Sequence, residues 1–295
     1  METLESLQRR IRSAEDLRSI VRIMKTLAAV SIRQYERAVE ALVEYNRTTD
    51  LGLQVVLAGW AQEQGRATKH SEGRLGAVVL GSDQGMCGQF NDHVVRHAVE
   101  SLDSMPIDPG NRALAGVGVR AASRLEEAGQ IVEDVYTLPG SALGITPLVQ
   151  HLLLLIDGWR MERDVNQVYL YYNRSAKGIA YHPTTLRLLP ISTEQLPREG
   201  INTWPSRSLP TFTMDRERLL AALIRQHLFV LLFRTIAESL ASENASRLIT
   251  MQMAEKNIDE RLAAFYKGYH DLRQSTITSE ILDIISGFEA LSEDY

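Results

Sequence analysis

The stretch Arg273-Gln-Ser-Thr-Ile-Thr-Ser-Glu-Ile281 lies in a segment whose pattern decides the fold. From Thr213 to the end there is no proline, and the only glycines are Gly268 and Gly287. Apolar residues recur at helical spacing through this segment. About 75 residues of helix would extend roughly 110 Å, several times the diameter of a small domain. We expect a long helix that projects from any globular part.

A second helical segment opens the chain. Residues 1–51 contain neither glycine nor proline. Small or apolar residues recur in steps of three and four, with one extra three-residue step from Ala14 to Leu17: Leu4, Leu7, Ile11, Ala14, Leu17, Val21, Met24, Ala28, Ser31, Tyr35, Ala38, Leu42 and Tyr45. Such a narrow stripe is typical of a coiled-coil seam, and the extra step predicts a local overwinding of the coil. We expect the two long helices to pair antiparallel.

The middle of the chain predicts an α/β domain. Short β-rich runs alternate with helical stretches, which is typical of a largely parallel sheet. The expected strands are residues 75–80, 114–119, 131–136, 165–172 and 185–191, and the expected helices are 91–102, 120–127 and 141–159. The fold class is therefore α/β plus a long antiparallel coiled coil, with a Rossmann-like domain of about five strands. We divide the chain into an N-terminal coiled-coil helix at 1–60, the α/β domain at 61–210 and a C-terminal coiled-coil helix at 211–295.

Composition limits the possible functions. The 295 residues carry a net charge of −5 and are 44% hydrophobic, which argues against nucleic acid as the main partner. The single cysteine, Cys87, excludes an internal disulfide. Seven basic residues between Arg9 and Arg33 stand against two acidic ones, Glu15 and Asp16. This basic band is either an ordinary solvated face or a surface that meets acidic partners.

One loop has the position of a ligand site. Gly81-Ser-Asp-Gln-Gly-Met-Cys-Gly88 follows an expected strand and precedes an expected helix, where glycines often let the backbone approach a phosphate. It lacks the Lys-Ser/Thr pair of a P-loop, so we favour a structural turn formed by Gly81, Asp83, Gly85, Cys87 and Gly88. A packed, inert thiol is the favoured state of Cys87. His93 and His97 have helical spacing but no glutamate between them, so we expect no metal site and no cofactor.

Three segments resemble the gamma subunit of F-type ATP synthases. They are the C-terminal helix with Ala241-Ser-Glu-Asn-Ala-Ser-Arg-Leu-Ile-Thr-Met251 and Arg273–Ile281, the loop from Gly81 to Asn91, and Met24-Lys-Thr-Leu-Ala-Ala29. The resemblance implies a non-catalytic subunit whose coiled coil is the central rotor shaft. Its implied partners are the alpha and beta subunits, the epsilon subunit and the c-ring, with membrane contact only through the complex, at the cytoplasmic face of the cell membrane.

The same resemblance implies roles for individual residues. The expected shaft and partner contacts are Met24, Lys25, Arg247, Arg273, Gln274, Thr278 and Glu280, and the expected apolar tip is Ile284, Ile285, Phe288 and Leu291. Two departures from the family pattern, at Ser31 and at Phe288-Glu289, raise the hypothesis of a divergent, sodium-translocating branch. The alternatives are a ligand- or nucleotide-binding α/β protein dimerised by its helices, and a homodimeric coiled-coil tether.

Overall fold

A computed structural model describes residues 3–58, 73–176, 179–191 and 210–292. The chain forms two compact units, which are described separately. Unit 1 combines Met1–Leu27 with Leu248–Tyr295, and unit 2 is Ala28–Arg247. These units divide the chain at different points from our division at 60 and 210, which stays a prediction.

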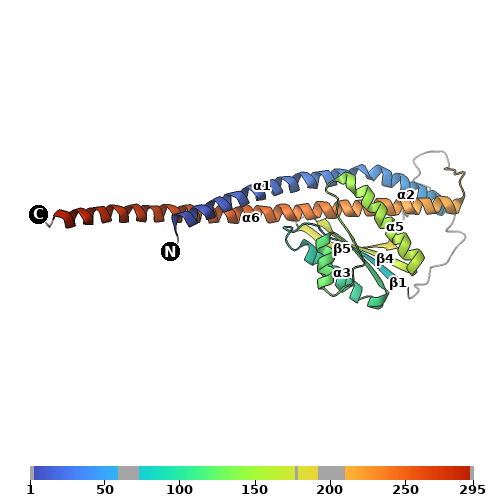
Figure 1. Cartoon of the computed structure of the whole chain (residues 1–295). Helices are drawn as coiled ribbons and strands as arrows, with labels where there is room; N and C mark the ends of the chain where they lie inside the picture. The colour runs from blue at the N-terminus through green and yellow to red at the C-terminus, as the bar shows by residue number, and fades with distance from the viewer. Residues whose placement is uncertain (1–2, 59–72, 177–178, 192–209, 293–295) are drawn as a thin grey trace. The chain divides into compact units, whose positions relative to one another are not determined.

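Two helices, not one, open the chain (Figure 1). Helix α1 is Leu4–Ala41 and α2 is Val43–Ala58, with a break at Leu42 where the sequence has neither glycine nor proline. Within unit 2, α2 buries Leu53 and Val56 in a small cluster of its own with Leu220. The expected single helix over 1–60 is therefore interrupted at Leu42, and the helix after the break packs on Leu220.

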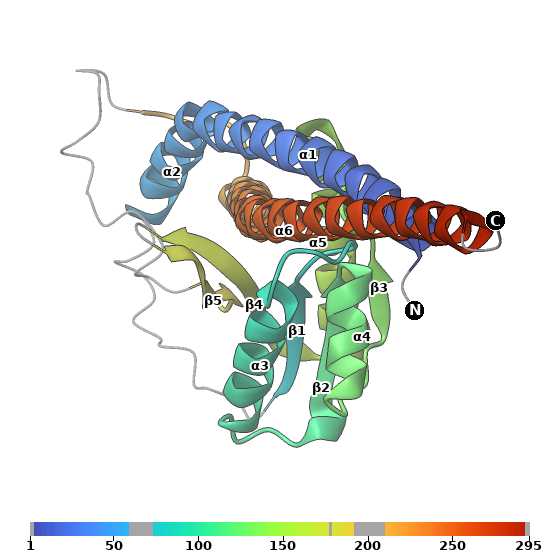
Figure 2. The same cartoon turned by 90° about the vertical axis from the view of Figure 1, so that its left-hand side faces the viewer.

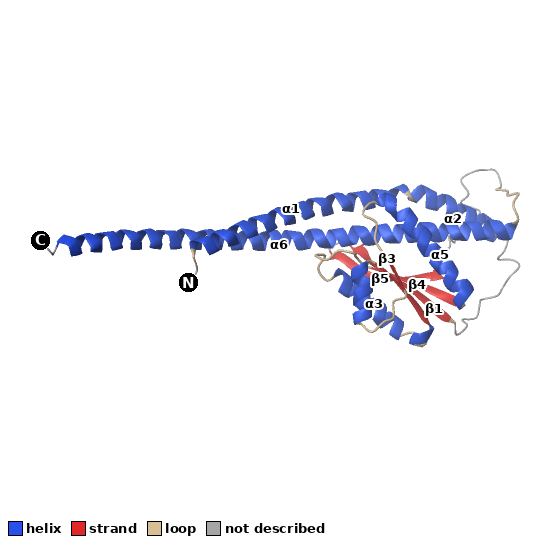
Figure 3. Cartoon of the chain, viewed as in Figure 1, coloured by secondary structure: helices blue, strands red, loops and turns tan. Residues whose placement is uncertain are grey.

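The C-terminal helix matches the glycine-poor pattern closely. Helix α6 is Arg216–Ser292, a run of 77 residues (Figure 3). Its residues up to Arg247 belong to unit 2 and the remainder to unit 1. The proline-rich segment that we expected to lead into it lies mostly outside the described residues.

The pairing of α1 with α6 in unit 1 follows the predicted antiparallel seam with one correction. Leu7, Ile11 and Val21 are buried on α1, and Met251 and Leu262 on α6. Leu17, which we placed on the seam, is 55% exposed. Arg18 follows it and forms an ion pair across to Asp259 on α6. The steps from Ala14 to Arg18 to Val21 are then four and three, so the predicted extra three-residue step is wrong.

Unit 2 contains a mixed five-stranded sheet in the order β3-β2-β1-β4-β5. The strands are β1 (Arg74–Leu80), β2 (Arg112–Val117), β3 (Asp134–Tyr136), β4 (Val165–Ala176) and β5 (Ile179–Leu189). The first four are parallel neighbours, and β5 returns antiparallel beside β4. The strand expected at 131–136 is shorter than predicted, since only its last three residues pair with β2.

Helices cover both faces of this sheet (Figure 2). Helices α3 (Phe90–Asp103) and α4 (Val119–Glu127) lie side by side on one face, where Val94, Ala98 and Leu125 join a core with Leu75 and Val79. Helix α5 (Ile145–Arg163) and the unit 2 part of α6 belong to the core of the other face. Alternate residues of β1 therefore point into two separate cores, as expected for a strand covered on both sides.

Two helical segments are long and apolar enough to span a membrane by length and composition alone, Ala142–Arg163 and Arg216–Ser286. In unit 2 both contribute apolar side chains to the core beside the sheet, among them Val149, Leu152, Leu232 and Ile236. Core helices of this kind pass the same test of length and composition as membrane spans do.

Candidate functional site

The loop from Gly81 to Gly88 is shaped by close packing. A Cβ atom at Gly81 would lie 2.3 Å from Ala121 Cβ and 2.5 Å from Asn91 Oδ1, so only glycine fits where the chain leaves β1. Met86 and Gly88 both have left-handed backbone conformations, with φ of 62° and 61°. The loop therefore makes a tight turn that brings its backbone carbonyls against neighbouring elements.

The polar groups of this loop are bonded inside the protein. Ser82 N donates to Asn91 Oδ1 at 2.9 Å, and Asn91 Nδ2 donates to Ser82 Oγ at 2.8 Å. Asp83 accepts hydrogen bonds from Val119 N at 2.9 Å and from Leu138 N at 2.7 Å. Val119 is the first residue of α4, so a carboxylate of the chain itself occupies the helix N-terminus where a phosphate would bind.

Helix α6 docks on the same loop through buried polar residues. Ser246 Oγ donates to Cys87 O at 2.7 Å, and Arg247 Nη2 donates to Gln84 O at 3.3 Å. Arg247 also forms a 2.5 Å ion pair with Glu243, and both side chains are at least nine-tenths buried. We call the Gly81–Gly88 loop together with Glu243, Ser246 and Arg247 the loop–helix junction.

The electrostatics of the junction follow from its burial. Burial raises the pKa of Glu243, and the adjacent Arg247 opposes that rise. Burial also raises the pKa of the Cys87 thiol, which lies 3.6 Å from Ser82 Oγ and is 1% exposed. A buried thiol with a raised pKa is a poor nucleophile, because the thiolate is the reactive form.

The histidine pair on α3 bonds to polar side chains. His93 Nε2 lies 3.0 Å from Gln89 Oε1, and its Nδ1 lies 3.2 Å from Tyr181 Oη. His97 Nε2 lies 2.8 Å from Thr185 Oγ1. Among the described residues there is no group of three or more His, Cys, Asp or Glu side chains placed to hold a metal ion.

The predicted shaft contacts have three different environments. Arg247 is buried in the junction, whereas Met24 is half-buried on α1 in unit 1. Lys25 Nζ lies 2.5 Å from Glu255 Oε2, so its charge is paired within unit 1. The four remaining contacts are all exposed on α6: Arg273, Gln274, Thr278 and Glu280. The structure does not bring these seven residues together into one site.

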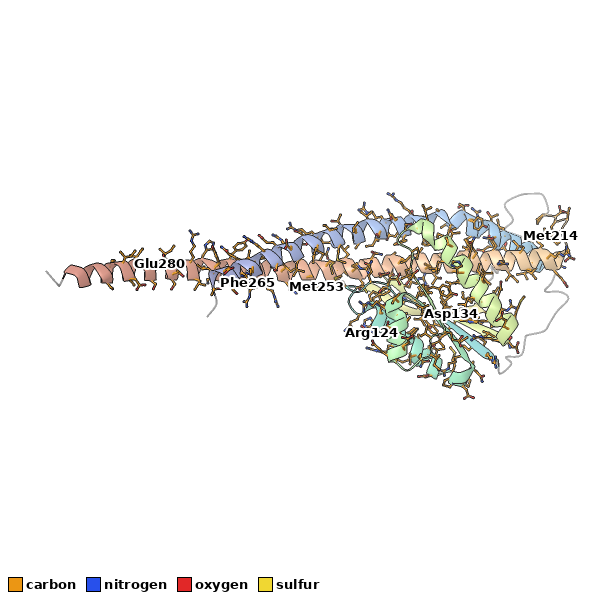
Figure 4. All side chains as sticks on the ribbon, in the orientation of Figure 1. Arg124, Asp134, Met214, Met253, Phe265 and Glu280 are labelled. Atoms are coloured by element: carbon orange, nitrogen blue, oxygen red, sulfur yellow. The ribbon has the colours of Figure 1, made fainter. Side chains whose placement is uncertain are left out.

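The end of α6 presents an apolar surface to solvent. Helix α6 continues past the N-terminal end of α1 within unit 1, and Glu280 lies on this extension (Figure 4). Ile284 and Ile285 are 72% and 47% exposed. The side chains of Phe288 and Leu291 lie outside the described residues. The part of the predicted apolar tip that is described is thus without cover in the chain itself.

Sequence reasoning missed the acidic partners of the basic band. Arg18 pairs with Asp259, while Arg22 and Lys25 both pair with Glu255. These three bases are therefore paired within unit 1, an arrangement that neither of the two interpretations of the band had included. The four-residue spacing of Glu255 and Asp259, matching that of Arg18 and Arg22, was the available signal.

Comparison with known sequences gives a consistent result over the full length. A family model described as ATP synthase matches residues 3–291. The chain is 26% identical over 296 residues to the ATP synthase gamma chain of Desulforamulus reducens, covering 99% of this chain and 100% of the relative. It is 29% identical over 299 residues to the ATP synthase gamma chain of Desulfitobacterium hafniense, with the same coverage.

Solved structures share the fold. The rotor of the Euglena gracilis mitochondrial ATP synthase aligns with a TM-score of 0.61 at 15% identity, covering 93% of this chain and 98% of that one. A central stalk chain of the Tetrahymena thermophila mitochondrial ATP synthase aligns with a TM-score of 0.55 at 20% identity, covering 80% of this chain and 99% of that one. At these identities the alignments show a shared fold.

Proposed function

The chain belongs to the ATP synthase family as a gamma chain, and we propose that it is the central rotor shaft that couples ion flow in the membrane sector to the catalytic sites. The observation that carries this proposal is the family match from residue 3 to residue 291, which includes both long helices and the sheet domain. The chain is a non-catalytic subunit of a membrane-associated complex.

The shaft acts by asymmetry. A helix pair that rotates inside a ring of alpha and beta subunits presents a different face to each of three otherwise equivalent catalytic sites. Contacts that differ between sites shift each site toward a different conformation, and so toward a different nucleotide affinity. Arg273, Gln274, Thr278 and Glu280 are the proposed contacts, because they are exposed on α6 beyond Tyr269, which accepts a hydrogen bond from Gln8 near the start of α1.

The remaining partners follow from the same role. The tip of α6 turns in an apolar sleeve of the hexamer, which accounts for the exposure of Ile284 and Ile285. The α/β domain contacts the epsilon subunit and the c-ring at the cytoplasmic face of the membrane. Lys25 and Arg247 brace the shaft, because their charges are paired inside the chain.

The rival function, a nucleotide-binding α/β protein, is disfavoured because its expected phosphate site is already occupied by a side chain of the protein. In doubly wound folds ligands bind at the carboxyl ends of the strands, often at a helix N-terminus. Here the Asp83 carboxylate accepts the hydrogen bond of Val119 N at that end of the sheet. Its negative charge repels the phosphate that such a ligand would bring.

Native mass spectrometry tests the proposed function. The tagged chain is purified from its host under mild conditions, and the eluate is assayed for ATP hydrolysis. The expected result is one copy of this chain with three copies each of two larger nucleotide-binding subunits, and ATPase activity in the same fraction. A monomer or homodimer that binds nucleotide by itself would overturn the assignment.

A further inference from the structure

Three charge pairs in a row join α1 to α6 inside unit 1, and these three have the same polarity. The base is on α1 and the acid is on α6. Arg18 Nε lies 2.7 Å from Asp259 Oδ1, Arg22 Nε lies 2.8 Å from Glu255 Oε1, and Lys25 Nζ lies 2.5 Å from Glu255 Oε2. We call these three pairs the charge ladder.

Glu255 is the centre of the ladder because each of its two oxygens binds a different base. Its side chain is 15% exposed, compared with 54% for Arg22 and 34% for Lys25. Hydrogen bonds from Lys25 and then from Arg22 lower the pKa of Glu255, so it stays ionised at neutral pH. One carboxylate thus fixes two positions, one helical turn apart, on the facing helix.

The apolar seam alone sets the axial position of the helices weakly. Small residues occupy part of it near the ladder, Ala14 on α1 and Ala254 on α6, and together with Leu17, Ile258 and Phe265 they line a hollow of about 560 Å³ between the helices. Apolar contacts are non-directional, so a seam with small side chains tolerates a slide of one turn better than a seam filled by large ones. Directional polar pairs are what specify register in helix pairs.

The sequence around the ladder penalises a slide in either direction. A four-residue slide one way brings Ala14, with Glu15 beside it, opposite Asp259 and leaves Glu255 with Arg18 alone. A four-residue slide the other way puts Thr26 and Ala29 opposite Glu255, which then has no basic partner, and moves Arg22 and Lys25 to Asp259. Each slide therefore breaks all three pairs: the first re-forms one and brings two acidic side chains close together, and the second re-forms two on Asp259 but leaves Arg18 and Glu255 without partners.

We propose that Glu255 is a positioning residue that locks the axial register of α1 against α6, so that the two helices of the shaft turn together without slipping. The proposal rests on the proposed rotor function for its effect on coupling, but not for its effect on register. Exposed ion pairs add little to net stability. Loss of the ladder should consequently change register and coupling without unfolding the chain.

The chain offers a matched control. Glu260 lies five residues from Glu255 on the same helix and pairs with Lys256 of that helix at 3.9 Å. Glu260→Gln removes the same charge as Glu255→Gln but no contact with α1. A triple variant, Arg22→Glu with Lys25→Glu and Glu255→Lys, reverses the central charges and keeps them complementary.

Register is measured on the full-length chain with spin labels at Ser19→Cys and Gln252→Cys in a Cys87→Ser background. Glu255→Gln should add a second interspin distance, displaced by about one helical turn of 5 Å. Glu260→Gln should keep the single distance, and the triple variant should restore it. An unchanged distance distribution in Glu255→Gln overturns the register lock, whatever the function of the chain.

Coupling is measured on the whole complex in membrane vesicles, as the ratio of the ATP-driven membrane potential to the rate of ATP hydrolysis. Glu255→Gln should lower this ratio at least twofold, with no change for Glu260→Gln and recovery in the triple variant. A changed distance with an unchanged ratio overturns the role of register in coupling. A ratio that falls equally in the Glu260→Gln control also overturns it, since net charge alone would then be the cause.

Discussion

Helix α6 buries polar side chains at the loop–helix junction and exposes apolar side chains at its far end. At the junction α6 buries Ser242, Glu243, Ser246 and Arg247, each at most 8% exposed. Beyond Arg273 it exposes Ile277, Ile281 and Ile284 by 45% to 72%. Buried polar groups with partners and exposed apolar groups without them both depart from the usual distribution of residues. The first marks a contact completed within the chain, and the second is the surface that we propose another subunit covers.

Breaking the junction should have the largest effect. Arg247→Met leaves Glu243 buried with no cation beside it, and removal of one partner from a buried pair costs about 3–5 kcal/mol. Urea unfolding followed by circular dichroism measures this free energy. The control, Arg273→Met at the exposed end, should stay within about 0.5 kcal/mol of the parent. A loss below about 1 kcal/mol for Arg247→Met would show that the pair is not isolated from water.

A smaller loss is expected where the loop meets α4. Gly81→Ala forces a Cβ to within 2.3 Å of Ala121 Cβ, and overpacking of this kind costs about 1–3 kcal/mol. Gly85→Ala in the same loop meets nothing within 4 Å, so it should be neutral or slightly stabilising. Thermal melts of both variants measure the difference. Equal melting temperatures would mean that the loop relaxes and that its shape is not fixed by packing.

Substitutions at the exposed end of α6 should impair the assembled complex but leave the stability of the isolated chain unchanged. Ile284→Ser with Ile285→Ser should change the unfolding free energy of the free chain by less than about 0.5 kcal/mol, since neither side chain has a partner to lose. The same variant should reduce ATP-driven pumping by the assembled complex. Pumping equal to that of the parent would remove the case for an apolar partner at this end.

The smallest effect is a pH dependence at the junction. The pKa of Glu243 is raised in the folded state above its ordinary value of 4.5, so the folded chain binds more protons than the unfolded chain between the two values. Stability contributed by this group is then full below 4.5 and is lost as the pH rises through the folded pKa, by at most about 1.4 kcal/mol per pH unit. Glu243→Gln should remove that slope from urea unfolding measured across pH. The same slope in both proteins would assign it to another group.

The sequence predicted local structure better than long-range placement. The strand at Leu75–Leu80 was predictable because an apolar run between turn residues is typical of a buried parallel strand. The neighbouring order β3-β2-β1-β4-β5 was not, because pairing depends on contacts far apart in the chain. The break at Leu42 has no glycine or proline to announce it.

For the candidate sites too, local features could be predicted from the sequence, whereas features that depend on long-range packing could not. The turn at Gly81–Gly88 has a local signal, whereas the buried state of Glu243 depends on where α6 packs. We placed Leu17 on the seam because it is apolar, although it breaks the regular alternation of three- and four-residue steps. Arg18 occupies that seam position instead. Its long aliphatic stem packs along the seam, and its charged end reaches Asp259. Charged residues on a seam are identified only when their partners on the other helix are known.

The carboxylate of Asp83 has a consequence for a protein that works among nucleotide sites. The sheet resembles those that bind nucleotides, and the cell holds ATP at concentrations that would fill a weak site. Because the Asp83 carboxylate already accepts the hydrogen bond of Val119 N, the N-terminus of α4 is not open to a phosphate. The N-terminus of α4 therefore gives ATP no phosphate site through which its concentration could act on the shaft.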